Sequence, residues 1–280
     1  MPAVDYLAIG HITLDRLRGG LLVGGSVSYA ATAAVRLGLA AGVVTSAGTE
    51  QDWASLLPGV EIVRCPASAT TSFENLYQSG RRLQRLLASA EPVGAEAVPA
   101  VWRQSPIVHL APVVHELGRD LATLFPGSLV GLTPQGLLRH WDASGLVRQG
   151  RWAGDDVLLS ACTVVVLSED DLVGDPDFLS RCIGRIPVVA VTRGAEGATL
   201  YVRGRPTEVA AFPATEVDPT GAGDVFAAAL LIELHRTEDP YHSAAFASCA
   251  ASFVVEGLGL RGVPDRASVE ARLELYRRER

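Results

Sequence analysis

The sequence has 280 residues and no lysine, because all 24 of its basic residues are arginines. This absence excludes three kinds of active site that depend on a lysine side chain: the GxxxxGK[ST] phosphate-binding loop, the strand lysine of protein kinases and Schiff-base catalysis. A phosphate-binding site in this chain must therefore use backbone amides, helix N-termini or arginine side chains.

Cysteine is sparse and shows no metal-binding or disulfide pattern. The four cysteines, at positions 65, 162, 182 and 249, are far apart, and none belongs to a CxxC pair. This spacing is typical of buried thiols in a reducing compartment and argues against a zinc site. A targeting segment is missing too, and the charge-free stretch 19–35 contains four glycines. We expect a cytoplasmic protein that does not interact with membranes.

The chain also lacks a basic block. Its 31 acidic residues outnumber the 24 basic ones, which gives a formal net charge of −7. This composition argues against nucleic acid as a partner. Hydrophobic residues make up 48% of the chain and charged residues 20%, so a large core can be buried.

Apolar strands and helical segments alternate along the sequence. Strands are expected at 4–9, 42–47, 60–63, 107–110, 128–132, 163–167 and 187–192, and helices at 26–37, 221–236, 241–255 and 266–278. This order predicts an α/β fold, a three-layer α/β/α sandwich around a mostly parallel central sheet.

Residues 70–88 interrupt the alternation. Polar and apolar residues alternate there on both sides of Ser79 and Gly80, which predicts a β-hairpin. The hairpin is either a flap over a binding site or an ordinary surface hairpin. We expect a single domain over residues 1–280, with the hairpin inserted at about 69–88 as a small lid.

The strongest functional pattern is the string DPTGAGDVF at 218–226, which leads into an apolar helix. It places Gly221, Ala222 and Gly223 at a helix N-terminus, where N–H groups are unpaired and the helix dipole is positive. Small residues let an anion approach, so the pattern predicts a phosphate or oxyanion site. Asp224 would stand beside it and could accept a proton from an attacking hydroxyl. An ordinary glycine-rich cap with a first-turn acid is the alternative.

The Asp-x-Thr-Gly-Ala-Gly-Asp string resembles that of the ribokinase-like (PfkB-type) carbohydrate kinases, and further motifs occur in the family's order. Residues 10–15 (GHITLD) are similar to the sugar-binding entry, Gly24-Gly25 to the glycine pair, residues 191–194 (VTRG) to the strand-end phosphate motif, and residues 246–264 to the segment around adenine. The resemblance covers essentially the whole chain. It implies a ribokinase-like fold and transfer of the ATP γ-phosphoryl group, with Mg²⁺, to a hydroxyl of a small polyhydroxylated molecule.

The resemblance also implies a role for each matching residue. The catalytic residues are Asp224 as general base, with Gly221, Ala222 and Gly223 supplying amides. The ATP-binding residues are Thr192, Arg193, Gly194, Ser168, Thr220 and Ser248. The acceptor-binding residues are Thr13, Asp15, Gly24, Gly25 and Tyr29. The residues expected near Mg²⁺ are Glu169 and Asp171, in the segment that replaces the family's Asn-x-x-Glu motif.

Departures from the family pattern bear on the acceptor pocket and the lid. Thr13 and Tyr29 stand where many relatives carry asparagine, which favours a smaller or more apolar pocket than a ribose site. Only eight residues separate Asp15 from Gly24, where typical relatives insert lid strands. The lid is therefore expected to consist mainly of the hairpin 70–88.

Several alternatives stay open from the sequence. Arg193 either binds phosphate in place of a lysine or is an exposed loop residue, and the acids at 169–171 either serve Mg²⁺ or stabilise a helix start. The acceptor is a sugar, an inositol-type cyclitol or a nucleoside. A non-catalytic nucleotide or ligand sensor would be an alternative use of the same fold. The protein is expected to be a monomer or a homodimer.

Overall fold

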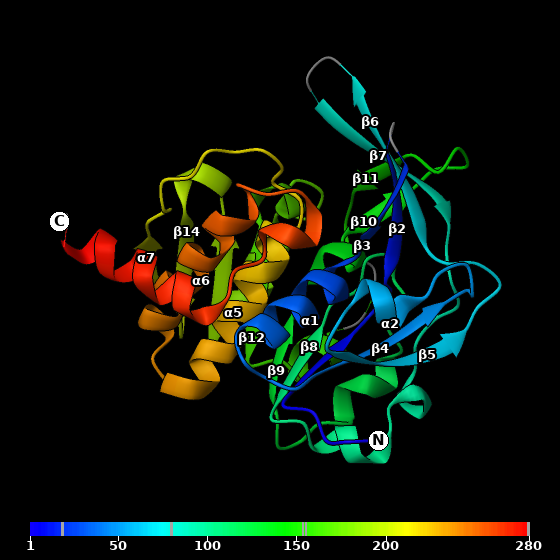
Figure 1. Ribbon diagram of the computed structural model, residues 1–280, viewed down its shortest axis with the longest axis horizontal. Coiled ribbons are helices and arrows are strands. Elements are labelled where there is room, and N and C mark those ends of the chain that lie inside the picture. Colours follow the sequence, from blue (N-terminus) through cyan, green and yellow to red (C-terminus); the bar gives the residue numbers. More distant parts are fainter. Residues whose placement is uncertain (18–19, 79–80, 153, 155, 279–280) are drawn as a thin grey trace.

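The computed structural model describes residues 1–280 except 18–19, 79–80, 153, 155 and 279–280, and it centres on a nine-stranded sheet (Figure 1). The strand order is β15-β14-β13-β12-β9-β8-β1-β4-β5. Neighbouring strands from β13 to β5 are parallel, whereas the pairs β13–β14 and β14–β15 at one edge are antiparallel. The predicted mostly parallel sheet is thus confirmed.

Seven strands of this sheet lie close to the predicted ranges, namely β1 (Tyr6–Ile9), β4 (Ala41–Ala47), β5 (Val60–Pro66), β8 (Ile107–Leu110), β9 (Leu129–Leu132), β12 (Val164–Ser168) and β13 (Val188–Thr192). The two strands at the antiparallel edge, β14 (Ala198–Val202) and β15 (Arg205–Val209), were not among the predicted strands. The central strands β1 and β8 are buried along their whole length. Their nearly continuous apolar runs follow from this burial, because a strand covered on both faces has no solvent side.

Helices cover both faces of the sheet. One face packs against α1 (Ser26–Arg36), α5 (Ala222–Thr237), α6 (Pro240–Val254) and α7 (Arg266–Arg278), together with the short α2 (Trp53–Leu56). The other face packs against α3 (Val157–Ser160), α4 (Asp177–Ile183) and several 3₁₀ turns. The three layers agree with the predicted sandwich. In the described part of the chain, no helix combines the length and the apolar character needed to cross a membrane.

A separate four-stranded sheet, which we call the lid, projects from one end of the molecule (Figure 1). Its strands are β3 (Gly20–Gly24), β2 (Thr13–Leu17), β6 (Ser72–Gln78) and β7 (Arg81–Ala88), in this spatial order. Strands β6 and β7 confirm the predicted hairpin, while its predicted turn residues, Ser79 and Gly80, lie outside the described residues. This hairpin supplies the two longer strands of the lid. The short segment after β1 supplies the other two, since β2 pairs with both β3 and β6.

A small hairpin of β10 (Arg139–Trp141) and β11 (Val147–Gln149) lies between β9 and β12 along the chain. Its turn is joined to the lid, because the N–H of Leu86 on β7 donates to Gly145 O at 2.8 Å. At the start of β10, the guanidinium carbon of Arg139 lies 5.9 Å from the centre of the Phe73 ring on β6, which places this side chain beside the lid.

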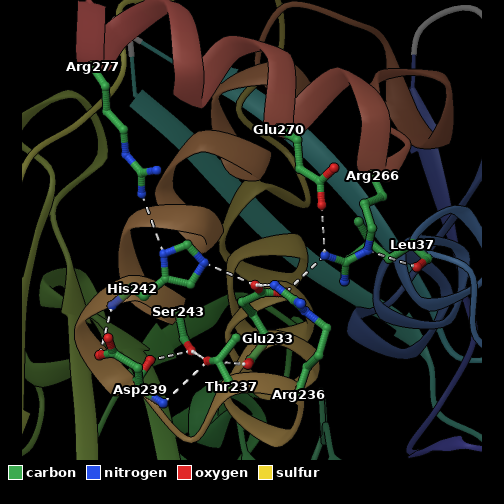
Figure 2. Close-up of polar contacts among 10 residues, drawn as sticks. All are labelled: Leu37, Glu233, Arg236, Thr237, Asp239, His242, Ser243, Arg266, Glu270 and Arg277. Atoms are coloured by element: carbon green, nitrogen blue, oxygen red, sulfur yellow. Dashed lines mark hydrogen bonds and ion pairs between the residues drawn. The ribbon is translucent and has the colours of Figure 1, made fainter.

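The C-terminal helices are held together by a buried carboxylate, Glu233 of α5 (Figure 2). It forms ion pairs with Arg236 of the same helix, with Arg266 at the start of α7 at 3.0 Å, and with His242 of α6 at 3.1 Å. Hydrogen bonds from the two arginines outweigh the effect of burial and hold the pKa of Glu233 below its ordinary value. This cluster anchors the C-terminal half of α5, whose N-terminus carries the predicted phosphate site.

Candidate active site

A cavity of about 720 Å³ opens where the parallel strands end, beside Ser168 of β12 and Thr192 of β13. Ligands of open α/β sheets bind at this edge, so an active site is expected here. The predicted residues that line the cavity are Thr13, Asp15, Gly25, Tyr29, Ser168, Thr192, Gly194, Thr220, Gly221, Ala222, Gly223, Asp224 and Ser248. In the described part of the chain, four predicted site residues do not line the cavity, namely Gly24, Glu169, Asp171 and Arg193.

The start of α5 offers backbone amides to the cavity. Gly221 caps the helix with φ +84°, a left-handed conformation that glycine adopts without strain. The N–H of Ala222 already donates to Pro219 O at 3.2 Å. The N–H groups of Gly223 and Asp224 belong to the first turn, where amides have no acceptor within the helix. A Cβ on Gly223 would meet no described atom within 4 Å, so an anion can approach these two amides.

Asp224, in the first turn of α5, has an unusually basic carboxylate. Burial raises the pKa of Asp224 to about 6, and the charges of Asp171 and Asp15 add to the rise. A hydrogen bond from Ser26 and the charge of Arg139 act in the opposite direction. Such a group is mostly ionised at neutral pH yet accepts a proton readily, which suits a general base.

The lid end of the cavity carries a second carboxylate, that of Asp15 on β2. It is 9% exposed and accepts a hydrogen bond from Thr13 Oγ1 at 3.2 Å. A Cβ on Gly24 of the paired strand would lie 2.8 Å from Thr13 Oγ1 and 3.0 Å from Asp15 Oδ2. Gly24 therefore does not line the cavity itself, but its missing side chain leaves room for the two residues that do.

Sequence reasoning missed several residues at this end of the cavity, namely Phe73, Gln84, Gln135 and Arg139. Phe73 and Gln84 belong to the lid hairpin. Gln135 and Arg139 follow β9. Their position just after the predicted strand 128–132 could have indicated them, because parallel strands end at one edge of the sheet and ligands bind there. Arg139 is the more important of the two, since it brings a positive charge to the cavity.

Arg193 was predicted to bind the donor phosphates, but its guanidinium group is engaged elsewhere. It forms an ion pair with Glu208 of β15 and donates a hydrogen bond to Thr199 Oγ1 of β14. Both partners lie on the antiparallel edge of the sheet, so they draw the side chain along that edge. The cation that lines the cavity is Arg139 instead.

The acids that follow β12 form a helix cap. Asp171 Oδ2 accepts hydrogen bonds from the Ser168 backbone N–H at 2.8 Å and from its Oγ at 2.7 Å, and the Asp171 N–H donates back to that Oγ at 3.2 Å. This reciprocal pair is a capping box, which favours the helix-start interpretation of Asp171. In the part of the chain that the structure describes, Asp170 lines the cavity and Glu169 does not.

The carboxylate of Asp170 fits a hard cation such as Mg²⁺ at this side of the cavity. The described residues contain no group of three or more His, Cys, Asp or Glu side chains that could hold a metal ion. A Mg²⁺ ion here would therefore take most of its ligands from phosphate oxygens and water, as this ion commonly does.

Small and apolar residues of α6 and of the loop before α5 line one part of the cavity, which we call the slot. They include Phe212, Pro213, Ala214, Ala251 and Val255. Ser248 also lines the cavity, but its hydroxyl donates to Ala210 O at 2.8 Å. The apolar lining of the slot suits a hydrophobic ring, and the hydroxyl of Ser248 is already engaged with the backbone.

Comparison with known proteins agrees with this site. The model of the pfkB family of carbohydrate kinases matches residues 174–266, a range that includes the predicted Asp218–Asp224 string. The matched region is the C-terminal part of the chain and includes the start of α5. This match, together with the kinases among the relatives, identifies the protein as a kinase.

Individual relatives of this kinase match most of the chain's length. A cytidine kinase of Thermococcus kodakarensis is 24% identical over 250 residues, which cover 83% of this chain and 89% of the relative. An inositol 3-kinase of Oryza sativa subsp. japonica is 30% identical over 258 residues, which cover 81% of this chain and 62% of the relative.

A solved structure confirms the ribokinase-like fold of the chain. It is a pyrophosphate-dependent kinase of the ribokinase family in complex with a pyrophosphate analog and myo-inositol. It matches with a TM-score of 0.79 and 20% sequence identity, over 96% of this chain and 99% of that one.

Proposed function

We propose that this kinase transfers the γ-phosphoryl group of ATP to a hydroxyl of a neutral polyol, with Asp224 as the general base. One observation carries the proposal: a single cavity joins the Asp15 carboxylate, the Asp224 carboxylate and the amides at the start of α5. An acceptor hydroxyl beside Asp224 can lose its proton to that carboxylate while it attacks the donor phosphorus. The amides of Gly223 and Asp224 would stabilise negative charge on the transferring group.

The charges at the lid end favour an uncharged acceptor. Asp15 and Asp224 outnumber Arg139, so an anionic acceptor would meet net repulsion. Gln84 and Gln135 provide amides that can donate to and accept from hydroxyl groups. We therefore favour a sugar or a cyclitol, and the similarity to an inositol 3-kinase supports the latter. A nucleoside is the second candidate, because another relative is a cytidine kinase.

The apolar slot supports ATP as the donor. A purine base can occupy it when the phosphates lie at the start of α5, whereas pyrophosphate would leave it empty. Bound Mg²⁺ would neutralise charge on the donor phosphates, with Asp170 as the nearest carboxylate of the cavity wall. Closure of the lid would exclude water, which competes with the acceptor for the phosphoryl group.

The decisive experiment measures phosphorylated product with Mg-ATP and with Mg-pyrophosphate against myo-inositol, ribose, fructose and cytidine. We expect turnover with ATP and one of the neutral polyols, and loss of it in the Asp224→Asn variant. Turnover with pyrophosphate alone would contradict the donor assignment. Nucleotide binding without turnover for any acceptor would favour the sensor.

The rate of the reaction should depend on pH through Asp224. Its pKa of about 6 predicts that the base is ionised above this pH and protonated below it. The value of kcat/KM should therefore be nearly constant from neutral pH upward and fall about tenfold per pH unit well below pH 6. A pH profile without this fall would remove Asp224 from the role of base.

Arg139 should bind the acceptor, whereas Arg193 should not. We expect Arg139→Met to raise KM for the acceptor by about 10–100-fold, the range for losing a charged hydrogen bond. The same change should raise the pKa of Asp224, because the Arg139 charge lowers it. Arg193→Met is the matched control: it removes a guanidinium paired with Glu208 and should leave this KM within about twofold. Equal effects of both variants would contradict the assignment.

A further inference from the structure

The aromatic ring of Tyr29 occupies the place where residue 221 would carry its side chain. A Cβ on Gly221 would lie 2.2 Å from both Cδ1 and Cε1 of the ring and 2.6 Å from Cγ. These distances are far shorter than any van der Waals contact, so the ring packs directly on the backbone of Gly221. The sequence suggested that Tyr29 shapes the acceptor pocket, but the structure places it against the phosphate-binding end of α5.

Tyr29 is itself held firmly. It is 3% exposed and belongs to the core between α1 and the sheet. Helix α1 begins after Gly25, where a Cβ would lie 2.4 Å from His11 O, and Ser28 Oγ donates to Gly24 O at 2.7 Å. The first turn of α1 is thus tied to the glycine pair and to the loop after β1, which makes the ring a rigid support.

The same turn of α1 also reaches the base. Ser26, three residues before Tyr29, hydrogen-bonds to the carboxylate of Asp224. Residues three apart share one face of a helix, so this face contacts two points of the α5 N-terminus, Gly221 and Asp224. Helix α1 therefore meets both the cap and the base of the candidate site.

We propose that Tyr29 is a positioning residue: its ring holds Gly221 in the left-handed conformation and so directs the amides of Gly223 and Asp224 at the transferring phosphoryl group. The inference rests on the proposed function. In this role Tyr29 affects the stability of the transition state, and therefore kcat, rather than the affinity for the acceptor. Amides that stabilise developing charge act only when they are fixed before the reaction, so a small rotation of the cap lowers the rate without much change in donor binding.

The test compares Tyr29→Leu with the matched control Tyr29→Phe, which keeps the ring. Calorimetry measures the Kd of MgADP alone and of MgADP with aluminium fluoride, an analogue of the transferring group. For Tyr29→Leu we expect kcat to fall by about 10–100-fold. The factor by which aluminium fluoride lowers the Kd of MgADP should shrink by at least about tenfold. MgADP alone and the acceptor KM should stay within about threefold, and Tyr29→Phe should keep most of the effect of aluminium fluoride, because its ring still packs on Gly221.

Three results would overturn the inference. Tyr29→Leu could keep the wild-type effect of aluminium fluoride, Tyr29→Phe could lose as much as Tyr29→Leu, or the acceptor KM could change while kcat does not. In each of these cases the wild-type enzyme still turns over, so the proposed function stands. A wild-type protein that shows neither turnover nor any effect of aluminium fluoride overturns the proposed function, and this inference with it.

A second variant tests the contact without altering Tyr29. Gly221→Ala places a methyl group inside the ring, so it should lower kcat by at least about tenfold and abolish the effect of aluminium fluoride. In the double variant with Tyr29→Leu the collision is relieved, and activity should exceed that of Gly221→Ala alone. Wild-type behaviour of Gly221→Ala, or strictly additive losses in the double variant, would contradict the proposed contact.

Discussion

Replacing Asp224 with asparagine is expected to lower kcat by about 10²–10⁴-fold, the range for losing a general base. Asparagine is nearly the same size and can still accept a hydrogen bond from Ser26, but its amide cannot take up the proton of the acceptor hydroxyl. The Kd of Mg-ATP should stay within a few-fold, because in the proposed mechanism backbone amides, and not this side chain, bind the phosphates. Steady-state kinetics and calorimetry measure the two quantities separately.

The neighbouring carboxylate provides the control for this prediction. Asp15→Asn also removes one negative charge from the cavity, but it lies on the lid strand β2 and should act mainly on KM for the acceptor. If Asp224→Asn changes only KM, or if it turns over at nearly the wild-type rate, Asp224 is not the base.

Replacing Glu233 with glutamine is expected to lower the free energy of unfolding by about 2–4 kcal/mol, near the range for breaking a buried ion pair. Two arginines, Arg236 and Arg266, lose their counter-charge at once, and the contact with His242 Nε2 is altered as well (Figure 2). We expect a loss of stability below the upper end of the range for buried ion pairs, because these partners are partly exposed and can recover some hydration. Urea denaturation measures the change.

Glu270→Gln is the matched control for Glu233. Glu270 pairs with the same Arg266 at 3.4 Å, but it is 54% exposed (Figure 2). Exposed pairs contribute little, so we expect a loss of less than about 1 kcal/mol. Similar losses for the two variants would show that burial of Glu233 does not determine its contribution.

The effect of Glu233 should also depend on pH in a defined direction. Its folded-state pKa is lowered, so its contribution is fully present above the unfolded pKa, near the ordinary value of 4.5. The contribution is lost as the pH falls through the lower folded value. The stability difference between the wild type and Glu233→Gln should therefore be constant at neutral pH and shrink in acid. A difference that grows in acid would contradict this.

The sequence by itself determined the central sheet and the start of α5. Strands β1 and β8 were predictable because burial on both faces leaves an apolar run that depends on few long-range details. The string 218–226 was informative for a similar reason: glycine conformation and first-turn amides are local properties of the chain. The functional interpretation of Asp224 followed from that local pattern and from the resemblance that it carries.

The tertiary structure alone decided which side chains meet in the cavity. Arg139 enters it beside Phe73 of the lid, whereas Arg193 is drawn to Glu208 on the edge strand β15. Asp171 is used in a cap, and Tyr29 packs on Gly221 from another helix. These outcomes depend on contacts between segments far apart in the sequence. Such contacts are set by how the layers pack, and no local pattern encodes their geometry.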